Sequence, residues 1–337
     1  MFPFLGRRIL HSLPTLFGVS LVAFLLIRMV PGDPVLLMLG ERGGSPETVA
    51  QLREKLGLDR TLAEQYGRFI GHALQGDLGE SIFSQRSVWE EFVDRFPATV
   101  ELSLVALFWA VLLGIPLGVL AALKRRGWVD HLLMSASLIG YSMPIFWWGL
   151  ILIMFFSVQL GWTPVSGRIG VAYDLEPWSG FLLIDTWRRG LGWAGFMSAV
   201  QHMILPAIVL GTVPVAAIAR MTRSSLLEVL REDYVRTAKA KGMGFYRVIF
   251  VHALKNALLP VVTVIGLMLG TLLTGAVLTE TLFSWPGVGR WLVASVLARD
   301  YPVLQGGVLL LSLMIVTVNV LVDLLYVWLN PRLRNSL

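Results

Sequence analysis

The sequence predicts an all-α polytopic membrane protein. The chain has 337 residues, of which 55% are hydrophobic and only 15% are charged, and its mean hydropathy is +0.71. This composition is typical of integral membrane proteins and not of soluble domains. Apolar runs of about 20 residues can cross roughly 30 Å of hydrocarbon as helices. We place the six predicted transmembrane helices at residues 9–30, 99–123, 132–158, 200–219, 257–280 and 303–329.

The distribution of basic residues predicts the orientation of these helices. If the N-terminus is cytoplasmic, the inner segments carry an excess of cations, whereas acids outnumber bases in the long outer loop 31–97. This asymmetry follows the positive-inside rule and places both termini in the cytoplasm. The basic pI of 9.8 then reflects topology, and no basic, aromatic-rich face indicates nucleic-acid binding. The inner cations are Arg7, Arg8, residues 124–126, the cluster from Arg220 to Lys255, Arg332 and Arg334.

Three segments follow from this topology. Residues 1–30 form an N-terminal transmembrane helix, which reads as a retained signal anchor because its apolar run is longer than that of a cleaved signal peptide. Residues 31–97 form an extracytoplasmic helical subdomain. Residues 98–337 form a five-helix core with a cytoplasmic loop at 220–256. The sequence has no cysteine, so the outer subdomain has to fold by burial without disulfides.

Helix start and stop signals support the outer subdomain. Ser45 is placed to cap a helix that has Pro46 at its first position and Gly57 at its end. Thr61 and Glu64 have the spacing of a capping box that opens a second helix. A third helix is expected around "SVWEEFVDRF", leading to Pro97 and the second transmembrane helix.

Catalytic and metal-binding motifs are missing from the sequence. It contains no G-x-x-x-x-G-K-[ST] phosphate loop, no H-E-x-x-H and no G-x-S-x-G, and its five histidines lack metal-ligand spacing. We therefore expect a non-enzyme that binds no cofactor and no metal. A membrane-embedded hydrolase would need a nucleophile and a base, and no such arrangement is present.

Polar residues within the predicted transmembrane helices are candidates for a pore or for helix pairing. Asn319 and Asp323 lie on one helix face, which suits either a structural polar pair or transport chemistry. Glu280, at the outer end of the fifth helix, suits an exit or a solvated interface. In "GYSMPIFWWG" we expect a kink beside an aromatic cluster, with either a packing or a pore-lining role. The pore-lining candidates are Tyr141, Ser142, Met143, Pro144 and Glu280.

The cytoplasmic segment "DYVRTAKAKG" predicts a short helix with a docking function. Asp233 is placed as its N-cap and Gly242 as the residue that follows its C-cap. Small residues at Ala238 and Ala240 leave room for a partner to approach the helix closely, and the segment lacks the bulky residues of a lipid-bound helix. The expected contact residues are Asp233, Tyr234, Arg236, Thr237, Ala238, Lys239, Ala240, Lys241 and Gly242.

This segment resembles the "EAA" loop of ABC importer permeases, whose helix inserts into an ATPase subunit. The sequence has "RTA" at 236–238 and matches the family pattern at Ala238, Gly242 and Leu254, but His252 and Lys255 stand where that pattern has Ile and Pro. A closer resemblance, over nearly the whole chain, is to the peptide-importer permeases and among them to dipeptide permease subunits. It is carried by "RRILHSLPTLFGVSLVAFLLIRMVPGDPV", "GYSMPIFWWG", "TPVSGR", "HMILPAIVLGTVP", "RMTRSSLLEVLREDYVRTAKAKG", "ETLFSWPGVGRW" and "RDYPVLQGGVLL".

The resemblance implies a type I ABC importer permease fold in the bacterial cytoplasmic (inner) membrane, and it implies partners. These are a second homologous permease, two ATP-binding subunits that hold ATP and Mg, an extracytoplasmic solute-binding protein, and membrane lipid. The implied function is ATP-driven import of dipeptides or short peptides. Haem, glutathione, nickel and longer peptides are the alternative substrates within this class. An ion-driven secondary transporter is a further alternative, but Asp323 alone offers little of the carboxylate relay that it needs.

Overall fold

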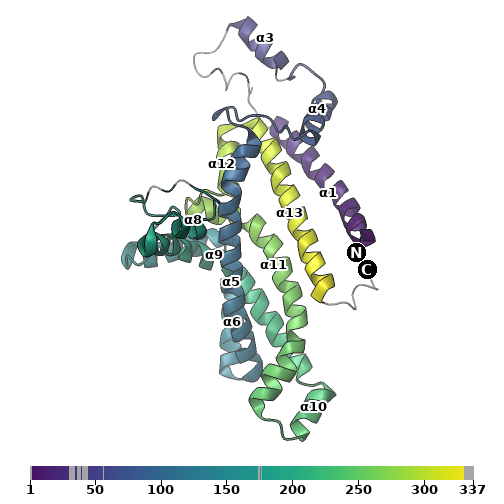
Figure 1. Ribbon diagram of the computed structural model, residues 1–337, viewed down its shortest axis with the longest axis vertical. Helices are drawn as coiled ribbons and strands as arrows, with labels where there is room; N and C mark the ends of the chain where they lie inside the picture. The colour runs from purple at the N-terminus through teal and green to yellow at the C-terminus, as the bar shows by residue number, and fades with distance from the viewer. Residues whose placement is uncertain are drawn as a thin grey trace. The chain divides into compact units, whose positions relative to one another are not determined.

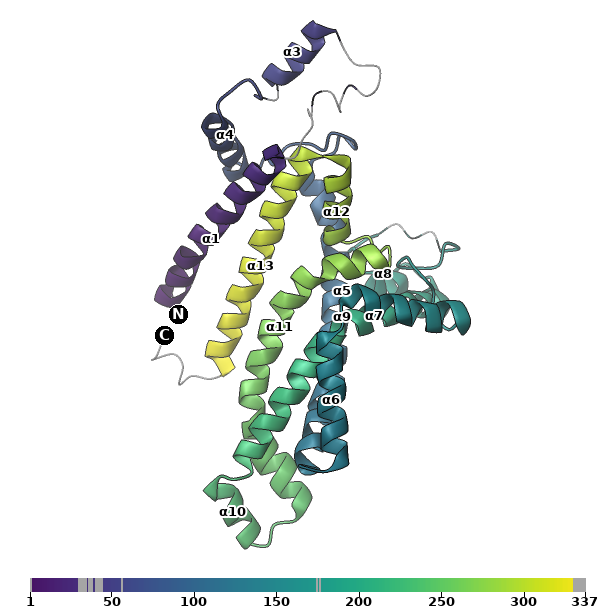
Figure 2. The same cartoon turned by 180° about the vertical axis from the view of Figure 1, so that it is seen from behind.

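The computed structural model describes residues 2–29, 35, 39, 45–55, 57–173, 175 and 177–329. Within these ranges the regular structure is helical, apart from an isolated antiparallel bridge between Glu80 and Ser87. The all-α prediction is therefore confirmed. The helices, shown in Figures 1 and 2, are α1 (Phe2–Met29), α3 (Pro46–Lys55), α4 (Leu62–Leu74), α5 (Val88–Leu123), α6 (Trp128–Ser142), α7 (Ile145–Leu152), the π-helix η1 (Ile153–Gln159), α8 (Leu182–Arg188), α9 (Gly192–Val229), α10 (Asp233–Ala240), the π-helix η2 (Arg247–Ala253), α11 (Leu254–Leu282), α12 (Val288–Ala298) and α13 (Tyr301–Leu329).

Four helical segments among the described residues are long and apolar enough to cross a membrane. They are α5, α9, η2 continued by α11, and the Tyr301–Val322 part of α13. A fifth crossing results if the bent pair formed by α6 and by α7 with η1 counts as one. The first predicted transmembrane helix, 9–30, overlaps α1 over residues 9–29, and the apolar described stretch of α1 is Leu10–Leu25. Length and composition thus support four to five crossings.

The third predicted transmembrane helix is broken in the middle. We expected one span at 132–158 with a kink, and the structure bends the chain by 108° between α6 and α7. Met143 and Pro144 both have extended backbone, with ψ of 133° and 129°. Proline disfavours the helical conformation in the residue before it and has no N–H to continue the ladder. The expected kink is confirmed at this place, and Figure 2 shows α7 running across the direction of α6.

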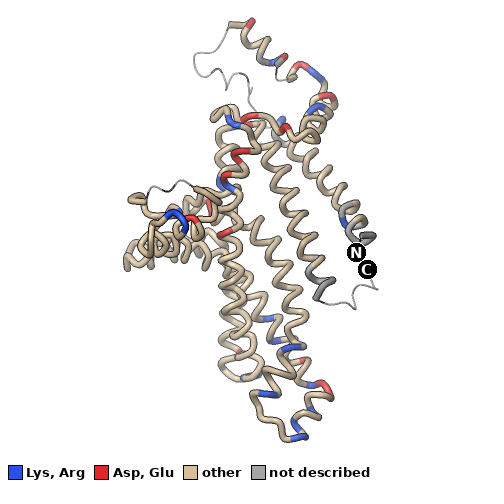
Figure 3. The backbone as a smooth tube through the Cα atoms, in the orientation of Figure 1, with Lys and Arg blue, Asp and Glu red and all other residues tan. Residues whose placement is uncertain are grey.

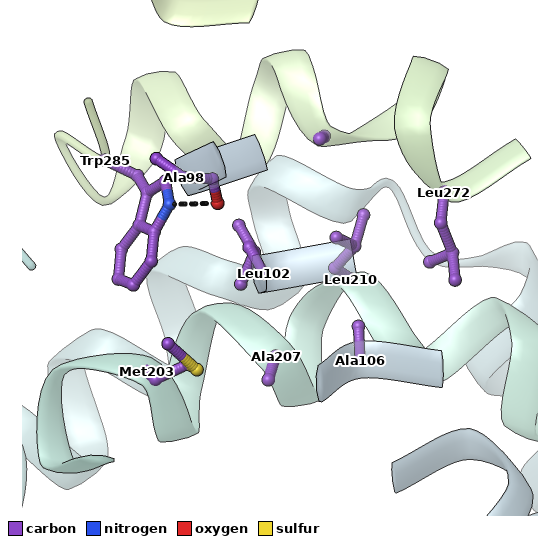
Figure 4. Packing of buried hydrophobic residues seen from close by; sticks show 9 residues of the cluster. Ala98, Leu102, Ala106, Met203, Ala207, Leu210, Leu272 and Trp285 are labelled. Atoms are coloured by element: carbon purple, nitrogen blue, oxygen red, sulfur yellow. Dashed lines mark hydrogen bonds between the residues drawn. The ribbon is translucent and has the colours of Figure 1, made fainter. Parts of the chain in front are cut away.

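The chain divides into two compact units, which we describe separately. The first joins residues 1–97 to 287–320, and the second comprises residues 98–286 with 321–336. The three-segment division that the sequence suggested stays a prediction. In the second unit, α9 packs along α11 and α6, and it shares buried clusters with α5. Figure 4 shows its largest buried cluster, in which the indole N–H of Trp285 donates to the carbonyl of Ala98 at 2.9 Å.

Small residues bring α5 and α9 close together. A Cβ atom added at Gly118 would lie 2.5 Å from the carbonyl oxygen of Ala219, and one at Gly211 would lie 3.0 Å from the carbonyl oxygen of Ala106. Helices in lipid gain little from hydrophobic burial against one another, so close backbone contact and its dispersion attraction hold them together. These glycines therefore fix the interhelical distance in the second unit.

Hydrogen-bonded carboxylates fix the segment between η1 and α9. Glu101 of α5, which is 5% exposed, accepts hydrogen bonds from the backbone N–H groups of Leu182 and Leu183 and from the Arg168 side chain. Asp185 is buried, which raises the pKa of its carboxyl. Hydrogen bonds from the Ser179 hydroxyl and from nearby backbone N–H groups outweigh this effect and hold the pKa of Asp185 below its ordinary value.

In the first unit, the predicted helix caps are confirmed. The Ser45 hydroxyl accepts a hydrogen bond from the backbone N–H of Thr48, and Gly57 has the positive φ of a helix stop, +65°. Thr61 and Glu64 form the full capping box of α4. The helix predicted before Pro97 does not end there, because α5 continues through this proline to Leu123.

Candidate coupling surface

The predicted cytoplasmic helix is present as α10, at the end of α9 and next to η2 (Figures 1 and 2). Its N-cap is Glu232, which has extended backbone, so the expectation that Asp233 is the N-cap was wrong by one residue. Glu232 makes no side-chain capping hydrogen bond. Asp233 is helical and places its charge in the first turn, where the helix dipole favours an anion.

The C-terminal end of α10 is formed as predicted. Gly242 has a φ of +75°, the left-handed conformation that glycine adopts without strain. Its N–H donates to the carbonyl of Lys239, and the N–H of Met243 donates to the carbonyl of Ala238. These two bonds make a Schellman motif, which satisfies carbonyl groups at the end of the helix.

Part of the face of α10 that was expected to receive a partner is buried against the chain itself. Val235 and Ala238 are buried in a cluster with Val248, packed against Val229 and Leu230 among others. Ala238 keeps only 7% of its surface exposed and is thus occupied by its own chain. The i, i+3 spacing of the two buried residues is what directs this face inward. Ala240, the other small residue, is exposed.

Tyr234 fixes α10 from its first turn. Its hydroxyl accepts a hydrogen bond from the Asn256 side chain at 2.7 Å and donates to the carbonyl of His252 at 3.3 Å. Both partners belong to the segment formed by η2 and α11. A helix of eight residues is too short to be stable in isolation, so these contacts and the Val235 cluster hold α10 in place.

The outer surface of this loop is basic and aromatic, and we call it the coupling surface. Figure 3 shows Lys and Arg gathered around α10. Phe245 and Tyr246 expose 61% and 76% of their surfaces, and the rings of Tyr246 and Phe250 are stacked. Sequence reasoning missed these aromatic residues, although "GFYRVIF" directly follows Gly242, and its statement that no basic, aromatic-rich face is present was therefore wrong for this loop. The coupling surface consists of Arg236, Thr237, Lys239, Ala240, Lys241, Phe245, Tyr246 and Phe250, all exposed.

An exposed surface of this kind suits a protein partner. Aromatic residues and arginine are enriched in the energetically dominant part of protein interfaces. Large apolar side chains gathered in an exposed patch indicate an interaction site. The predicted contact residues Arg236, Thr237, Lys239, Ala240 and Lys241 are available to such a partner.

A buried ion pair connects the helix that leads into α10 with α6. The Arg223 guanidinium donates to both carboxylate oxygens of Asp130, at 2.6 and 2.7 Å. Asp130 is 2% exposed and also accepts a hydrogen bond from the backbone N–H of Arg126. The two residues of the pair are 93 positions apart in the sequence, and sequence reasoning did not single out either. Bidentate pairing fixes the relative position of two helices more tightly than a single contact does.

The predicted pore-lining residues are placed on α6 and around its bend. Tyr141 is 53% exposed, and the Ser142 hydroxyl donates to the carbonyl of Leu138. Ser142, Met143 and Pro144 border an open hollow of about 570 Å³. Glu280 lies elsewhere, fully buried in the helix packing, where it accepts a hydrogen bond from Thr99 at 2.6 Å.

The structure does not bring the remaining predicted residues into a site. Asn319 is exposed on α13, and the side chain of Asp323 lies outside the described residues, so their pairing stays a prediction. Among the residues that the structure does describe, no group of three or more His, Asp or Glu side chains is arranged for a metal ion. What the geometry offers is an exposed basic and aromatic surface on a helix that is fixed to η2 and α11.

Comparison with known proteins identifies the family. Residues 114–335 match the family described as "Binding-protein-dependent transport system inner membrane component", and residues 1–103 match its N-terminal region. The chain is 58% identical to the di/tripeptide transport system permease protein DppB of Pseudomonas aeruginosa (strain UCBPP-PA14) and 57% identical to the dipeptide transport system permease protein DppB of Escherichia coli (strain K12). Both matches cover 100% of each chain.

More distant similarities agree with this result. The glutathione transport system permease protein GsiC of Escherichia coli O6:H1 is 41% identical over 99% of both chains. An inward-facing crystal form of the MetNI methionine ABC transporter has a similar fold, with a TM-score of 0.53, 18% identity, and coverage of 69% of this chain and 93% of that one. The chain therefore belongs to the family of inner membrane components of binding-protein-dependent transport systems, the ABC importer permeases, and is a multi-pass protein of the inner membrane.

Proposed function

We propose that this chain is one permease subunit of an ATP-driven importer for dipeptides or short peptides. The observation that carries the proposal is the identity of 57 to 58%, over the full length, to two permeases named for di- or tripeptide transport. The 41% identity to a glutathione permease makes glutathione the second candidate substrate. Glutathione is itself a short peptide, so both candidates share free carboxylates and an amino group.

We propose further that the chain crosses the membrane six times with both termini in the cytoplasm. The six predicted transmembrane segments coincide with α1, α5, the bent pair of α6 and α7, α9, α11 and α13. The basic coupling surface and residues 124–126 then lie together on the cytoplasmic side, as the positive-inside rule favours. In this arrangement residues 31–97 face outward and receive the solute-binding protein.

The proposed mechanism couples ATP hydrolysis on partner chains to movement of α9 and α6. ATP and Mg belong to two ATP-binding subunits, one of which seats the coupling surface, and a second homologous permease completes the pore. When the ATP-binding subunits close, α10 moves as a rigid piece because Val235, Ala238 and Tyr234 fix it to its neighbours. The motion passes along α9 to Arg223 and across to Asp130 on α6. Such rigid-body movement switches the pore between its outward- and inward-facing states.

Reconstitution of the complete transporter tests the function. The four membrane and ATP-binding subunits are placed in vesicles, and uptake of a labelled dipeptide, a labelled pentapeptide and glutathione is measured with the loaded binding protein outside. We expect ATP-dependent dipeptide uptake, with little uptake when a non-hydrolysable ATP analogue replaces ATP. ATP-dependent uptake of glutathione but not of dipeptides would identify the second candidate. Uptake that follows an ion gradient without ATP would overturn the importer assignment.

Single cysteines test the proposed topology, because the natural chain has none. Ser45→Cys, Arg125→Cys and Ser336→Cys are each treated in intact spheroplasts with a thiol reagent that does not cross the membrane. We expect labelling at position 45 alone, and labelling at all three positions after the membrane is permeabilised. Labelling at 125 or 336 in intact spheroplasts would contradict the cytoplasmic placement of the termini and of the loop after α5.

A further inference from the structure

Arg220 places a positive charge beside apolar helix surface. Its Nε–H donates to the carbonyl of Ala216, one turn toward the N-terminal end of α9, at 3.3 Å. The guanidinium lies over the ring of Tyr141 on α6, with 4.9 Å from Cζ to the ring centroid. The side chain thus points back along the apolar part of α9, away from the basic end that leads to α10. A charge held at membrane depth is costly, so it needs a counterpart.

The position of the Arg220 guanidinium along α6 and α9 follows from the contacts of the neighbouring residues. Gly140, the residue before Tyr141, approaches Thr212 so closely that an added Cβ would lie 3.0 Å from the Thr212 Cγ2 atom. Thr212 lies well inside the apolar stretch of α9, and its hydroxyl accepts a hydrogen bond from the indole N–H of Trp148. The guanidinium is therefore held at the level of the membrane-crossing part of α6 and α9.

Arg220 differs from the other arginine nearby in what surrounds it. Arg223, three residues along α9, donates two hydrogen bonds to the Asp130 carboxylate in a bidentate ion pair. Arg220 is half-buried, and no described carboxylate forms an ion pair with it. The Arg220 Cζ atom lies 4.9 Å from the centroid of the Tyr141 ring, a cation–π contact, and the Ala216 bond uses only Nε–H. The N–H groups on Nη1 and Nη2 stay in a planar fork, the geometry that binds a carboxylate through two parallel hydrogen bonds.

A hollow large enough for a small organic molecule is lined by the neighbours Gly140 and Ala216, although Arg220 and Tyr141 themselves are not among its lining residues. Ala216 and Gly140 line a hollow of about 320 Å³ between α5, α6 and α9, whose other walls include Trp109, Leu113 and Leu133. Small-molecule sites combine mostly apolar walls with a few placed polar groups. The hollow and the guanidinium together offer apolar contact for a peptide side chain and a charged contact for its terminus.

We propose that Arg220, held by Tyr141, binds the carboxylate of the peptide as it passes through the permease. This inference rests on the proposed function, since it names the chemical group of the transported molecule that the permease itself contacts. A zwitterionic dipeptide that leaves water has to replace the hydration of its carboxylate, and charge-assisted hydrogen bonds from Arg220 do so. A counter-carboxylate contributed by another protein helix is the competing explanation, which the experiment separates.

The test compares Arg220→Gln, Arg220→Lys and Tyr141→Leu with the unmodified transporter in vesicles, using saturating loaded binding protein. We expect Arg220→Gln to lower ATP-dependent dipeptide uptake by about tenfold, the effect of losing a hydrogen-bonded charge. Subunit assembly and the stimulation of ATP hydrolysis by the loaded binding protein should persist, so that fewer peptides enter per ATP. Arg220→Lys keeps the charge but not the fork and should give an intermediate loss, as should Tyr141→Leu. Lys124→Gln, an exposed cation at the end of α5, is the matched control and should be neutral.

Each other outcome overturns the inference in a recognisable way. If the unmodified transporter takes up no peptide with ATP, the proposed function fails and the inference falls with it. If the unmodified transporter works and Arg220→Gln equals it, only the inference falls. If Arg220→Gln and Arg220→Lys both lose subunit assembly, or if Asp323→Asn restores uptake to Arg220→Gln, Arg220 is a structural partner of a protein carboxylate. A peptide amide that the binding protein accepts gives the final control, because its uptake should not depend on Arg220.

Discussion

Replacement of Asp130 by alanine is expected to destabilise the permease by about 3 kcal/mol and to abolish coupled uptake. The substitution leaves the Arg223 guanidinium without its carboxylate in a site that is only 28% exposed. Breaking a buried ion pair costs about 3 to 5 kcal/mol. We take the lower value because part of the Arg223 side chain is exposed to solvent. The substitution also removes the link between α6 and the helix that leads into α10, so ATP hydrolysis should continue without peptide uptake in the protein that assembles.

The measurements for Asp130 are thermal unfolding in detergent, and ATP hydrolysis and uptake in vesicles. Asp94→Ala is the matched control, because Asp94 also pairs with an arginine, Arg86, at 2.8 Å, but both side chains are about half exposed. Exposed pairs contribute below about 1 kcal/mol, so this variant should unfold close to the unmodified temperature. The double variant Asp130→Leu/Arg223→Met should regain stability, since apolar residues can replace a buried pair. Unchanged stability and uptake in Asp130→Ala would show that the pair neither stabilises the permease nor couples ATP hydrolysis to uptake.

The second large effect is expected for Ala238→Trp. Ala238 is 7% exposed and packs with Val235 and Val248 of its own chain, so an indole cannot fit without moving α10. Overpacking of this kind costs about 1 to 3 kcal/mol locally. The displaced helix should no longer present the coupling surface, and both the binding of the ATP-binding subunits and peptide uptake should be lost while membrane insertion persists.

Ala240→Trp provides the matched control for this effect. It adds the same side chain to the same helix, on its exposed face, so the Val235 cluster stays intact. Hydrogen exchange over residues 233–253 should rise in Ala238→Trp and stay unchanged in Ala240→Trp. Pull-down of the ATP-binding subunits then measures their binding to the coupling surface. We expect Ala240→Trp to weaken this binding, because residue 240 lies in that surface. If Ala238→Trp retains full ATP-coupled uptake, α10 has no coupling role.

The sequence by itself determined the features that depend on local pattern. Apolar runs of about 20 residues located the long helices, because the period and length of a membrane-crossing helix appear in consecutive residues. Ser45, Thr61 with Glu64, and Gly242 marked helix ends, because a cap is decided within three or four residues of the chain. Pro144 marked the bend for the same reason, since its ring acts on its neighbouring residue. Each of these is a property of a few adjacent positions.

The tertiary structure alone decided which surfaces meet. Spacing placed Ala238 on a small face of α10, but only the packing of Val248 and Val229 showed that this face belongs to its own chain. The ion pair of Asp130 with Arg223 spans 93 residues and leaves no periodic pattern in the sequence. The same holds for the cation–π contact of Arg220 with Tyr141. Such contacts depend on how α6 and α9 lie against each other, which is set by the total burial of both helices. The total burial of two helices depends on residues far apart in the sequence and cannot be judged from a short segment. The roles of these charged residues are therefore visible only in the folded chain.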